Sequence, residues 1–509
     1  MTPDTLGPAM AVDRWVRWWA SREPDKPALV FGDRTTSYGE LDREVSRAAG
    51  WLRSRGVAPG ERVACLFRNH PAVVTLFLAC SRAGAVFVPW NARSAPGELA
   101  QRLRDADPAL VLVQEELAGR IPPRPGRDDP WVVAGAEPPW AGAPGGGPDG
   151  DTAAPGPEAP QVILYTSGTT GRPKGAVLPV RKGFFNALNA LEFLDLRRED
   201  QVLLVLPLFH SGGLFIQLVP ALYAGCTVLL HPRFDPDAVL RGIREGGGTQ
   251  LLTVPTVLRR LLAAGGAAEL GRLRACGVGG EPVPEELIRA CTGAGIELRQ
   301  LMGQTETSIF LWATSRDLRE RPGTVGRPVR YADVRVGDAA ARPLPPGRPG
   351  ELWVRGPTVM TGYWNDPDLT RQAFLEGWLR TGDLARRDEA GFHYLVGRAK
   401  DMYISGGENV YPAEVEAVLR EHPAVAEAAV IGVPDPTWGE VGHAFLEPVP
   451  GAAIDPEEVL EWCAGRLARF KCPRHVTVVP ELPRTDLGKV RKAELLGRAR
   501  GGTGGVDHK

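Results

Sequence analysis

The most distinctive chemistry in the sequence is a stretch of serine, threonine and glycine at residues 165–175. Its hydroxyl groups can donate hydrogen bonds, its glycines let backbone N–H groups approach an anion closely, and Lys174 adds a positive charge. It is not a Walker A loop, because Arg-Pro follows Gly171 and no Lys-Ser or Lys-Thr pair closes the motif. A plain turn is the simpler interpretation, but so much phosphate-loop chemistry directly after a strand is rare. We therefore expect the β and γ phosphates of a nucleotide at Thr166, Ser167, Gly168, Thr169, Thr170, Gly171 and Lys174.

A carboxylate follows a second apolar run, in the sequence Met302-Gly-Gln-Thr-Glu306. Hard cations such as Mg²⁺ take oxygen ligands from one or two carboxylates together with substrate phosphates. Glu306 is therefore a candidate Mg²⁺ ligand, and the Thr166 hydroxyl joins it in the predicted metal set. Taken alone, a glutamate in such a place is more often a solvated surface charge.

Three weaker motifs complete the set of polar residues. Residues 279–282 end another apolar run with two glycines, which would let a flat base lie against the backbone. Asp383 offers a carboxylate that can accept hydrogen bonds from two ribose hydroxyl groups, and Arg398 can join it. Lys489 stands in a Pro/Gly loop near the C-terminus. Each motif alone is explained by a turn or a solvated charge, so only their combination supports a site.

The elements that must position these residues alternate between short apolar runs and amphipathic stretches. The runs are rich in branched residues and bounded by Gly or Pro, which predicts buried strands at 162–165, 202–206, 227–230, 251–254 and 298–302. Helices are predicted at 38–56, 237–245 and 257–264 from apolar spacings of three and four residues. Strand–helix alternation predicts parallel sheets covered by helices.

Two changes along the chain divide it. Pro and Gly make up roughly half of residues 121–160, which predicts a surface loop or linker rather than a helix or strand. Beyond residue 397 we predict a small α+β domain of about 110 residues. Its helices are expected at 412–420 and 456–467, and its strands at 425–433 and 441–448. The predicted domains are 1–397, a hinge at 398–401, and 402–509.

Composition narrows the class of protein. The chain has 509 residues, 43% of them hydrophobic, and 60 Lys+Arg against 61 Asp+Glu give a net charge of −1. This balance argues against nucleic acid as the main partner, and no apolar run is long enough to span a bilayer. Charged residues replace the apolar stretch of an export signal near the N-terminus. Seven scattered cysteines without a C-x-x-C pair predict buried free thiols, so we expect a cytoplasmic protein.

Together these segments resemble the adenylate-forming superfamily, and most closely its fatty-acyl and aryl CoA ligase branch. The resemblance covers nearly the whole chain, from residues 27–41 to Gly488-Lys489, and includes the motifs at 350–356, 362–364 and 404–416. It implies an α/β fold with a large N-terminal domain of helix-covered sheets and a small mobile α+β C-terminal domain. It also implies ATP and coenzyme A as cosubstrates with Mg²⁺, and a hydrophobic carboxylic acid as substrate.

The resemblance assigns roles to individual residues. Lys489 would bridge the acid and the α-phosphate, Glu306 would hold Mg²⁺, and Lys400 would be the hinge about which the small domain alternates between two positions. Ser405, Gly406 and Gly407 would line the path of coenzyme A. The adenine and ribose would contact Gly279, Gly280, Glu281, Pro282, Met302, Gly303, Gln304, Thr305, Asp383 and Arg398.

The acyl pocket is expected at residues 208–213. His210 would be a catalytic gate beside Phe209, although a lone histidine is more often part of the core. Gly212 and Gly213 leave room for a bulky apolar acid, unless neighbouring side chains fill that space. The segment lacks the aspartate with which amino-acid-activating relatives pair an α-ammonium, so the acid is expected to lack that group.

Two positions depart from the family pattern, and two other functions stay open. Met302 stands where an aromatic residue is usual, and Pro-Val-Arg at 179–181 replaces a Thr-His pattern. The predicted function is an acyl-CoA ligase that proceeds through an acyl-AMP intermediate. The alternatives are a ligase that loads the pantetheine of a carrier protein, or a member that retains one half-reaction or only binds its ligand. The sequence leaves the oligomeric state open and admits a homodimer.

Overall fold

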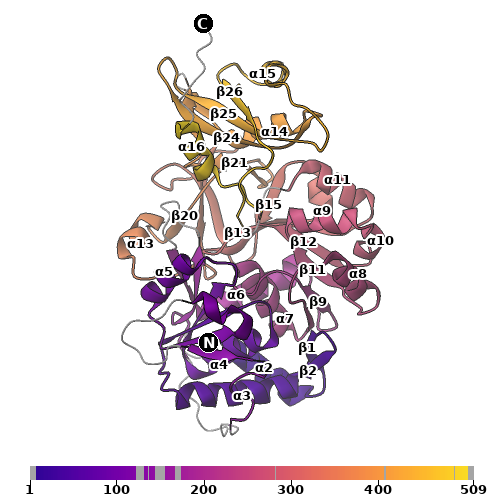
Figure 1. Ribbon diagram of the computed structural model, residues 1–509, viewed down its shortest axis with the longest axis vertical. Helices are drawn as coiled ribbons and strands as arrows, with labels where there is room; N and C mark the ends of the chain where they lie inside the picture. Colours follow the sequence, from indigo (N-terminus) through magenta and orange to yellow (C-terminus); the bar gives the residue numbers. More distant parts are fainter. Residues whose placement is uncertain are drawn as a thin grey trace. The chain divides into compact units, whose positions relative to one another are not determined.

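The computed structural model describes residues 7–121, 131–135, 137–143, 155–166, 174–280, 283–405, 408–485 and 488–501. The chain divides into two compact units (Figure 1). Unit 1 comprises Met1–Val334 and Val354–Leu379, and unit 2 comprises Arg335–Trp353 and Arg380–Lys509. Unit 2 includes residues before and after the predicted hinge at 398–401. This division therefore does not test the predicted domain boundaries, which stay a prediction.

One sheet of unit 1 is mostly parallel. Its strand order is β15-β14-β13-β12-β11-β9-β10-β1-β2, and the neighbours from β1 to β13 pair in parallel. This confirms the predicted strands at 202–206, 227–230, 251–254 and 298–302, to within two residues at either end. The strands are β1 (Pro27–Phe31), β2 (Arg34–Ser37), β9 (Gln201–Leu204), β10 (Thr227–Leu230), β11 (Gln250–Thr253), β12 (Ala275–Gly279), β13 (Leu298–Gln304), β14 (Ser308–Ala313) and β15 (Thr324–Pro328).

A second sheet of unit 1 carries the phosphate-loop motif. Its order is β18-β8-β7-β4-β3-β5-β6, and its strands are β3 (Arg62–Phe67), β4 (Val86–Asn91), β5 (Leu110–Gln114), β6 (Trp131–Ala134), β7 (Pro160–Thr166), β8 (Lys174–Pro179) and β18 (Gly362–Tyr363). β7 and β8 form an antiparallel pair, whereas β3, β4, β5 and β6 pair in parallel. Buried Val, Leu, Ile and Trp side chains form its core, among them Leu66, Val88, Trp90, Val111 and Ile163.

The sequence prediction was wrong at β6. The region 121–160 was expected to contain no strand, yet Trp131–Ala134 pairs with β5 in parallel register. These four residues are apolar and contain neither Pro nor Gly, and a strand this short at a sheet edge needs only one neighbour for its hydrogen bonds. The high Pro and Gly content of residues 121–160 as a whole led to the prediction of a loop and obscured the short apolar run at Trp131–Ala134.

The helices of unit 1 begin and end at recognisable signals. The predicted helix at 38–56 is α3 (Tyr38–Ser54), where the Ser37 hydroxyl accepts from the Glu40 N–H and the Glu40 carboxylate accepts from the Ser37 N–H. The predicted helices at 237–245 and 257–264 are α8 and α9. The other elements are η1 (Gly7–Met10), α2 (Val12–Arg22), α4 (Pro71–Ala83), α5 (Pro96–Ala106), η2 (Glu115–Arg120), α6 (Val180–Phe193), η3 (Gly212–Leu218), α7 (Val219–Ala224), α8 (Pro236–Arg244), α9 (Pro255–Ala263), α10 (Ala267–Leu270), α11 (Glu285–Gly293), α12 (Ser315–Glu320), α13 (Pro367–Ala373) and β19 (Phe374–Leu375).

Unit 2 contains the predicted C-terminal elements. Its helices are α14 (Pro412–Arg420), α15 (Pro456–Ala464) and α16 (Lys492–Gly501), and the long antiparallel pair β24–β25 packs on α14 through Val415, Leu419 and Val430. The predictions at 412–420, 425–433, 441–448 and 456–467 are confirmed, although α15 ends three residues early. The strands are β16 (Asp333–Gly337), β17 (Gly350–Arg355), β20 (Trp378–Arg387), β21 (His393–Arg398), β22 (Tyr403–Ser405), β23 (Glu408–Val410), β24 (Val425–Asp435), β25 (Gly439–Pro448) and β26 (His475–Val478).

The cysteines are all free, as predicted. Six are buried, and Cys472 is half-buried. Burial raises the pKa of the Cys226 thiol to about 12 and those of the Cys291 and Cys463 thiols to about 11. Within the described residues, no helix combines the length and apolar character needed to cross a membrane.

Candidate active site

The described ends of the predicted phosphate loop lie on a tight antiparallel pair of strands. Thr166 at the end of β7 is opposite Lys174 at the start of β8, and the Thr166 hydroxyl donates to the Lys174 carbonyl at 3.4 Å. The Lys174 ammonium lies 5.7 Å from the centre of the Tyr363 ring. The predicted phosphate ligands between the two strands fall outside the described residues: Ser167, Gly168, Thr169, Thr170 and Gly171.

The glycines at the ends of β12 and β13 are needed for strand packing. A Cβ atom on Gly279 would stand 2.3 Å from the Leu301 carbonyl oxygen, and one on Gly303 would stand 2.3 Å from the Ser308 carbonyl oxygen. Gly280 is exposed and has a φ of +83°, which favours glycine. Close approach of neighbouring strands therefore explains Gly279, whereas Gly280 is the glycine with open space on one side. Glu281 and Pro282 lie outside the described residues.

A strained turn follows β13 and carries Thr305 and Glu306. The Gln304 N–H donates to the Thr307 hydroxyl at 3.1 Å, and the Thr307 N–H donates to the Gln304 carbonyl at 3.2 Å. Ser308 has a φ of +58°, a conformation that costs a non-glycine residue free energy. Met302, Gly303, Gln304, Thr305 and Glu306 are all half-buried at this strand end, so the structure brings these predicted residues together.

Glu306 is held at both its backbone and its side chain. The Tyr363 hydroxyl donates to Glu306 Oε1 at 3.0 Å, and the Met360 N–H donates to the Glu306 carbonyl at 2.7 Å. Burial, and then the negative charge of Glu306, raise the pKa of the Tyr363 phenol, so the phenol stays a donor. Tyr363 belongs to the 362–364 motif, but its contact with Glu306 was not predicted.

A fully buried lysine, also missed by sequence reasoning, lies within electrostatic range of Glu306. Lys182, in the first turn of α6, is 0% exposed, and its ammonium donates to the Thr358 carbonyl at 2.5 Å. Burial holds the pKa of Lys182 well below its ordinary value, and the charge of Glu306 opposes that shift. Its neighbour Arg181 donates to the Pro357 carbonyl at 2.5 Å and to the Val359 carbonyl at 2.9 Å. Two adjacent cationic side chains thus contact one short backbone segment.

In unit 2, Asp383 and Arg398 form the predicted pair. They are opposite each other across β20 and β21, with Arg398 Nε 2.7 Å from Asp383 Oδ1. The Asp383 residue is only 4% exposed, and its N–H donates to the Thr381 hydroxyl at 3.1 Å. A buried carboxylate that is paired with an arginine stays ionised and keeps lone pairs for further donors.

Lys489 lies within electrostatic range of this pair. Lys489 is exposed as a residue, yet partial desolvation of its ammonium lowers the pKa of Lys489 to about 8. The positive charges of Arg398 and Lys400 lower the pKa further, whereas Asp383 opposes them. The structure therefore brings Lys489 within electrostatic range of Asp383, Arg398 and Lys400, all of which lie far from it in the sequence.

The predicted hinge and coenzyme A residues follow the same pair of strands. Lys400 is exposed two residues after the end of β21. Ser405 is buried at the end of β22, where it is opposite Glu408 of β23 and Gly439 of β25. Gly406 and Gly407 lie outside the described residues.

The predicted acyl-pocket segment packs tightly. The Phe209 and His210 rings lie 4.7 Å apart at 56°, and Phe209 packs against the core of the β7–β8 sheet. A Cβ atom on Gly213 would stand 2.4 Å from the Pro207 carbonyl oxygen, so backbone fills the space that the sequence left open for an acid. On Gly212 a Cβ atom would lie 3.2 Å from Leu206 Cδ1. The alternative that neighbours fill this space is therefore correct for Gly213. Both glycines begin η3, a π-helical turn of the kind that often marks functional sites.

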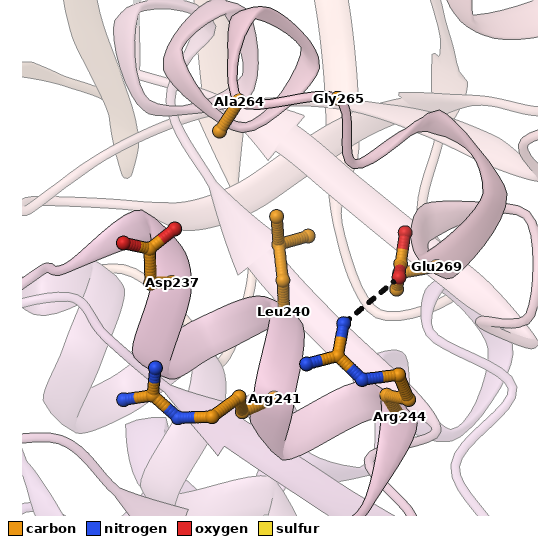
Figure 2. Close-up of a pocket in the computed structure, with 7 residues that line it drawn as sticks. All are labelled: Asp237, Leu240, Arg241, Arg244, Ala264, Gly265 and Glu269. Carbon is orange, nitrogen blue, oxygen red and sulfur yellow. Dashed lines mark hydrogen bonds and ion pairs between the residues drawn. The ribbon is translucent and has the colours of Figure 1, made fainter.

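A separate small hollow of about 210 Å³ lies against α8 and α10 (Figure 2). Its walls are mainly charged, and Arg244 is paired with Glu269 across it at 3.2 Å. None of the predicted site residues contributes to it. Its lining residues are Asp237, Leu240, Arg241, Arg244, Ala264, Gly265 and Glu269.

The donor chemistry around Glu306 fits a hard cation. Within the described parts of the chain, no group of three or more His, Cys, Asp or Glu side chains could hold a metal ion. A Mg²⁺ ion that is bound by one carboxylate, a hydroxyl and substrate phosphates needs no such group. Glu306 would supply the carboxylate and Thr166 the hydroxyl, which are oxygen ligands of the kind that Mg²⁺ prefers.

The family model for the AMP-binding enzyme matches residues 16–364, and that for the AMP-binding enzyme C-terminal domain matches residues 414–489. The chain belongs to the AMP-binding enzyme family, and within it to the ATP-dependent acid–CoA ligases.

Relatives and solved structures match nearly end to end. The chain is 40% identical to the indoleacetate–CoA ligase of Aromatoleum aromaticum over 96% of this chain and 98% of that protein. It is 32% identical to ATP-bound MatB from Rhodopseudomonas palustris, with a TM-score of 0.87 over 96% of this chain and 99% of that one. It is 31% identical to the o-succinylbenzoate CoA synthetase MenE from Bacillus subtilis in complex with its acyl-adenylate intermediate, with a TM-score of 0.83 and coverage of 94% and 97%.

Proposed function

We propose that this enzyme joins an aromatic carboxylic acid to coenzyme A in two steps, with Lys489 acting in the first. The observation that supports the proposal is the ion pair between buried Asp383 and Arg398, with Lys489 within electrostatic range of it. A cation next to a ribose-binding carboxylate would lie close to the α-phosphate of the same nucleotide.

In the first step, a carboxylate oxygen of the acid attacks the α-phosphorus of ATP. A bond forms between that oxygen and phosphorus, the bond to the bridging oxygen breaks, and pyrophosphate leaves. Two anions must approach each other, so the barrier is lowered by positive charge and alignment. Lys489 would neutralise the acid and the α-phosphate, and Lys174 would neutralise the departing phosphates.

Asp383 and Arg398 would orient the nucleotide during this step. The Asp383 carboxylate, which lies 2.7 Å from Arg398 Nε, would accept hydrogen bonds from the ribose hydroxyl groups. The half-buried side chain of Met302 would cover one face of the adenine by dispersion contact.

Glu306 and Thr166 would hold Mg²⁺, which supplies charge neutralisation of the phosphates when it is bound. The Tyr363 hydroxyl fixes one oxygen of the Glu306 carboxylate at 3.0 Å and adds no charge to it.

In the second step, the thiol sulfur of coenzyme A attacks the acyl carbon. A thioester bond forms, the bond to the phosphate oxygen breaks, and AMP leaves. We propose that rotation about Lys400 withdraws Lys489 and presents Ser405, Gly406 and Gly407 to the pantetheine arm.

One feature argues against an amino acid as substrate, and a second favours an aromatic acid. The segment 208–213 offers no carboxylate to pair with an α-ammonium, and burying an unpaired ammonium would be costly. The indoleacetate–CoA ligase, an enzyme named for an aromatic acid, is 40% identical to this chain. We also propose that the enzyme is located in the cytoplasm and can form a homodimer.

A product assay tests this function. A panel of arylacetic, hydroxycinnamic, benzoic and straight-chain fatty acids is incubated with Mg²⁺-ATP, with either coenzyme A or a pantetheinylated carrier protein. Pyrophosphate release and the mass of the thioester are measured. Aryl-CoA formation with at least tenfold preference over fatty acids is expected. Products on the carrier protein alone, or preference for fatty acids, would contradict the proposal.

A further inference from the structure

Arg181 and Lys182, the second and third residues of α6, both donate to carbonyl groups of residues 357–359. Arg181 contacts the carbonyls of Pro357 and Val359, and Lys182 contacts the carbonyl between them at 2.5 Å. Three successive carbonyls are therefore held by two adjacent side chains, although 176 residues of sequence separate Lys182 from Thr358. We name this set of contacts the Arg181–Lys182 clamp.

The clamped segment leads directly to the two residues that hold Glu306. Met360, next after Val359, donates its N–H to the Glu306 carbonyl at 2.7 Å. Three residues later, the Tyr363 hydroxyl donates to the Glu306 carboxylate at 3.0 Å. The chain between them is fixed to β8, because the Thr361 N–H donates to the Val177 carbonyl at 3.0 Å. A shift of residues 357–359 would move the Met360 N–H and, through it, the Glu306 backbone from which the carboxylate extends, while β18 holds Tyr363 in place.

Burying the Lys182 side chain in the core costs free energy that an apolar side chain would not cost. Lys182 is 0% exposed, and taking an ammonium out of water costs several kcal/mol even after the protein relaxes. A methionine has nearly the same length and would occupy the space without that cost. Arg181 also has an outer partner, since its Nε lies 2.6 Å from Glu158, so only part of its contacts serve the segment.

We propose that Arg181 and Lys182 are positioning residues that fix the Glu306 carboxylate for its cation by clamping residues 357–359. The inference rests on the proposed role of Glu306 as the Mg²⁺ ligand. It also gives a purpose to the Pro-Val-Arg sequence at 179–181, which departs from the family pattern.

The test measures the binding of ATP by titration calorimetry over a series of Mg²⁺ concentrations, without any acid. Lys182→Met and Arg181→Gln are compared with wild type, Glu306→Gln and the double variant Lys182→Met/Glu306→Gln. Arg316→Gln, which removes an exposed ion pair with Glu320 on α12, is the matched control. The thermal unfolding midpoint of each variant is recorded alongside.

Loss of one positioning hydrogen bond should raise the half-saturating Mg²⁺ concentration about three- to tenfold. Lys182→Met should show this rise with an unchanged or higher unfolding midpoint, Arg181→Gln should show a smaller rise, and Arg316→Gln should show none. The double variant should be no weaker than Glu306→Gln alone, because both changes remove the same contribution. Unchanged Mg²⁺ dependence in Lys182→Met, or effects that multiply in the double variant, would overturn the proposal.

The design separates this inference from the proposed function. If wild type binds ATP with Mg²⁺ dependence but forms no aryl thioester, the substrate proposal fails and the clamp is still tested. If Glu306→Gln leaves the Mg²⁺ dependence unchanged, the metal role of Glu306 fails and the clamp fails with it.

Discussion

Two carboxylates of the candidate site, Glu306 and Asp383, lie in opposite electrostatic surroundings. Asp383 is 4% exposed and is paired with Arg398 at 2.7 Å. Glu306 is half-buried and accepts from the neutral Tyr363 hydroxyl; no arginine or lysine among the described residues forms an ion pair with its carboxylate. One carboxylate already has its cation, and the other has a neutral donor.

This difference indicates which partner each carboxylate suits. An ion-paired carboxylate gains little from a second cation but still accepts hydrogen bonds from neutral hydroxyl groups, as a ribose would supply. A carboxylate without an ion pair gains most from a divalent cation. Asp383 is therefore suited to accept hydrogen bonds from hydroxyl groups, and Glu306 is suited to bind a divalent cation. The residues around each carboxylate can be changed separately to test this difference.

The largest expected effect follows removal of the cation beside the Asp383 pair. Lys489→Ala should slow pyrophosphate release by about 10²–10³-fold, which is the loss typical of one transition-state donor. Thioester formation from supplied acyl-AMP should stay within a few-fold of wild type. Both rates are measured by rapid quench. Equal losses of rate in the two steps would contradict a specific role of Lys489 in the first step.

The second prediction contrasts the two carboxylates directly. Asp383→Asn leaves Arg398 without its partner and should lower the free energy of unfolding by up to about 3 kcal/mol, because Arg398 is 35% exposed and water compensates part of the cost of a broken buried pair. Glu306→Gln should change stability by less than about 1 kcal/mol while it weakens Mg²⁺-dependent ATP binding. Urea unfolding of both variants checks this. Similar losses of stability in the two variants would contradict the proposed difference between the surroundings of Asp383 and Glu306.

The third prediction concerns the pH dependence of the first step. The proposed first step needs the ammonium form of Lys489, whose pKa is lowered to about 8. We therefore expect kcat/KM for ATP to be constant below pH 8 and to fall about tenfold per pH unit above it. Removing a neighbouring positive charge raises the pKa of a lysine, so Arg398→Gln should move this decline to higher pH. The profile is measured from pH 6 to 10. A decline that stays in place in the variant would show that Arg398 does not influence Lys489.

The smallest effect is expected at the neutral donor of Glu306. Tyr363→Phe removes one hydrogen bond of 3.0 Å and should cost about 0.5–1.5 kcal/mol in Mg²⁺-dependent ATP binding, or roughly a two- to tenfold change. Calorimetry at several Mg²⁺ concentrations detects a change of this size. A loss as large as that in Glu306→Gln would mean that the phenol contacts the nucleotide or the cation itself.

Local sequence patterns predicted most strands because each buried strand is a short apolar run with breakers at its ends. β10 and α14 have the predicted bounds, and β7, β9, β11 and β13 differ by a few residues. The same reasoning failed at β6, where four apolar residues are surrounded by a Pro/Gly-rich stretch. Composition averaged over a long window cannot reveal a strand that is stabilised by its neighbour β5.

The candidate site was predicted less completely because its contacts join distant residues. The motif at 362–364 suggested a family, but nothing local indicated that Tyr363 donates to Glu306, 57 residues away. Nothing in the local sequence indicated that Lys182 is buried and donates to the Thr358 carbonyl, 176 residues away. The pairing of Asp383 with Arg398 was suggested by resemblance, whereas the lowered pKa of Lys489 required the tertiary structure.

The buried cysteines have a consequence for an enzyme that holds an activated acyl group. Thiolates, not thiols, are the nucleophiles that attack such groups. Burial raises the pKa of Cys65, Cys80 and Cys276 far above neutrality, so these sulfur atoms stay protonated as well as enclosed. These three thiols are therefore poor acceptors of the activated acyl group, which favours its transfer to the thiol that arrives with the second substrate.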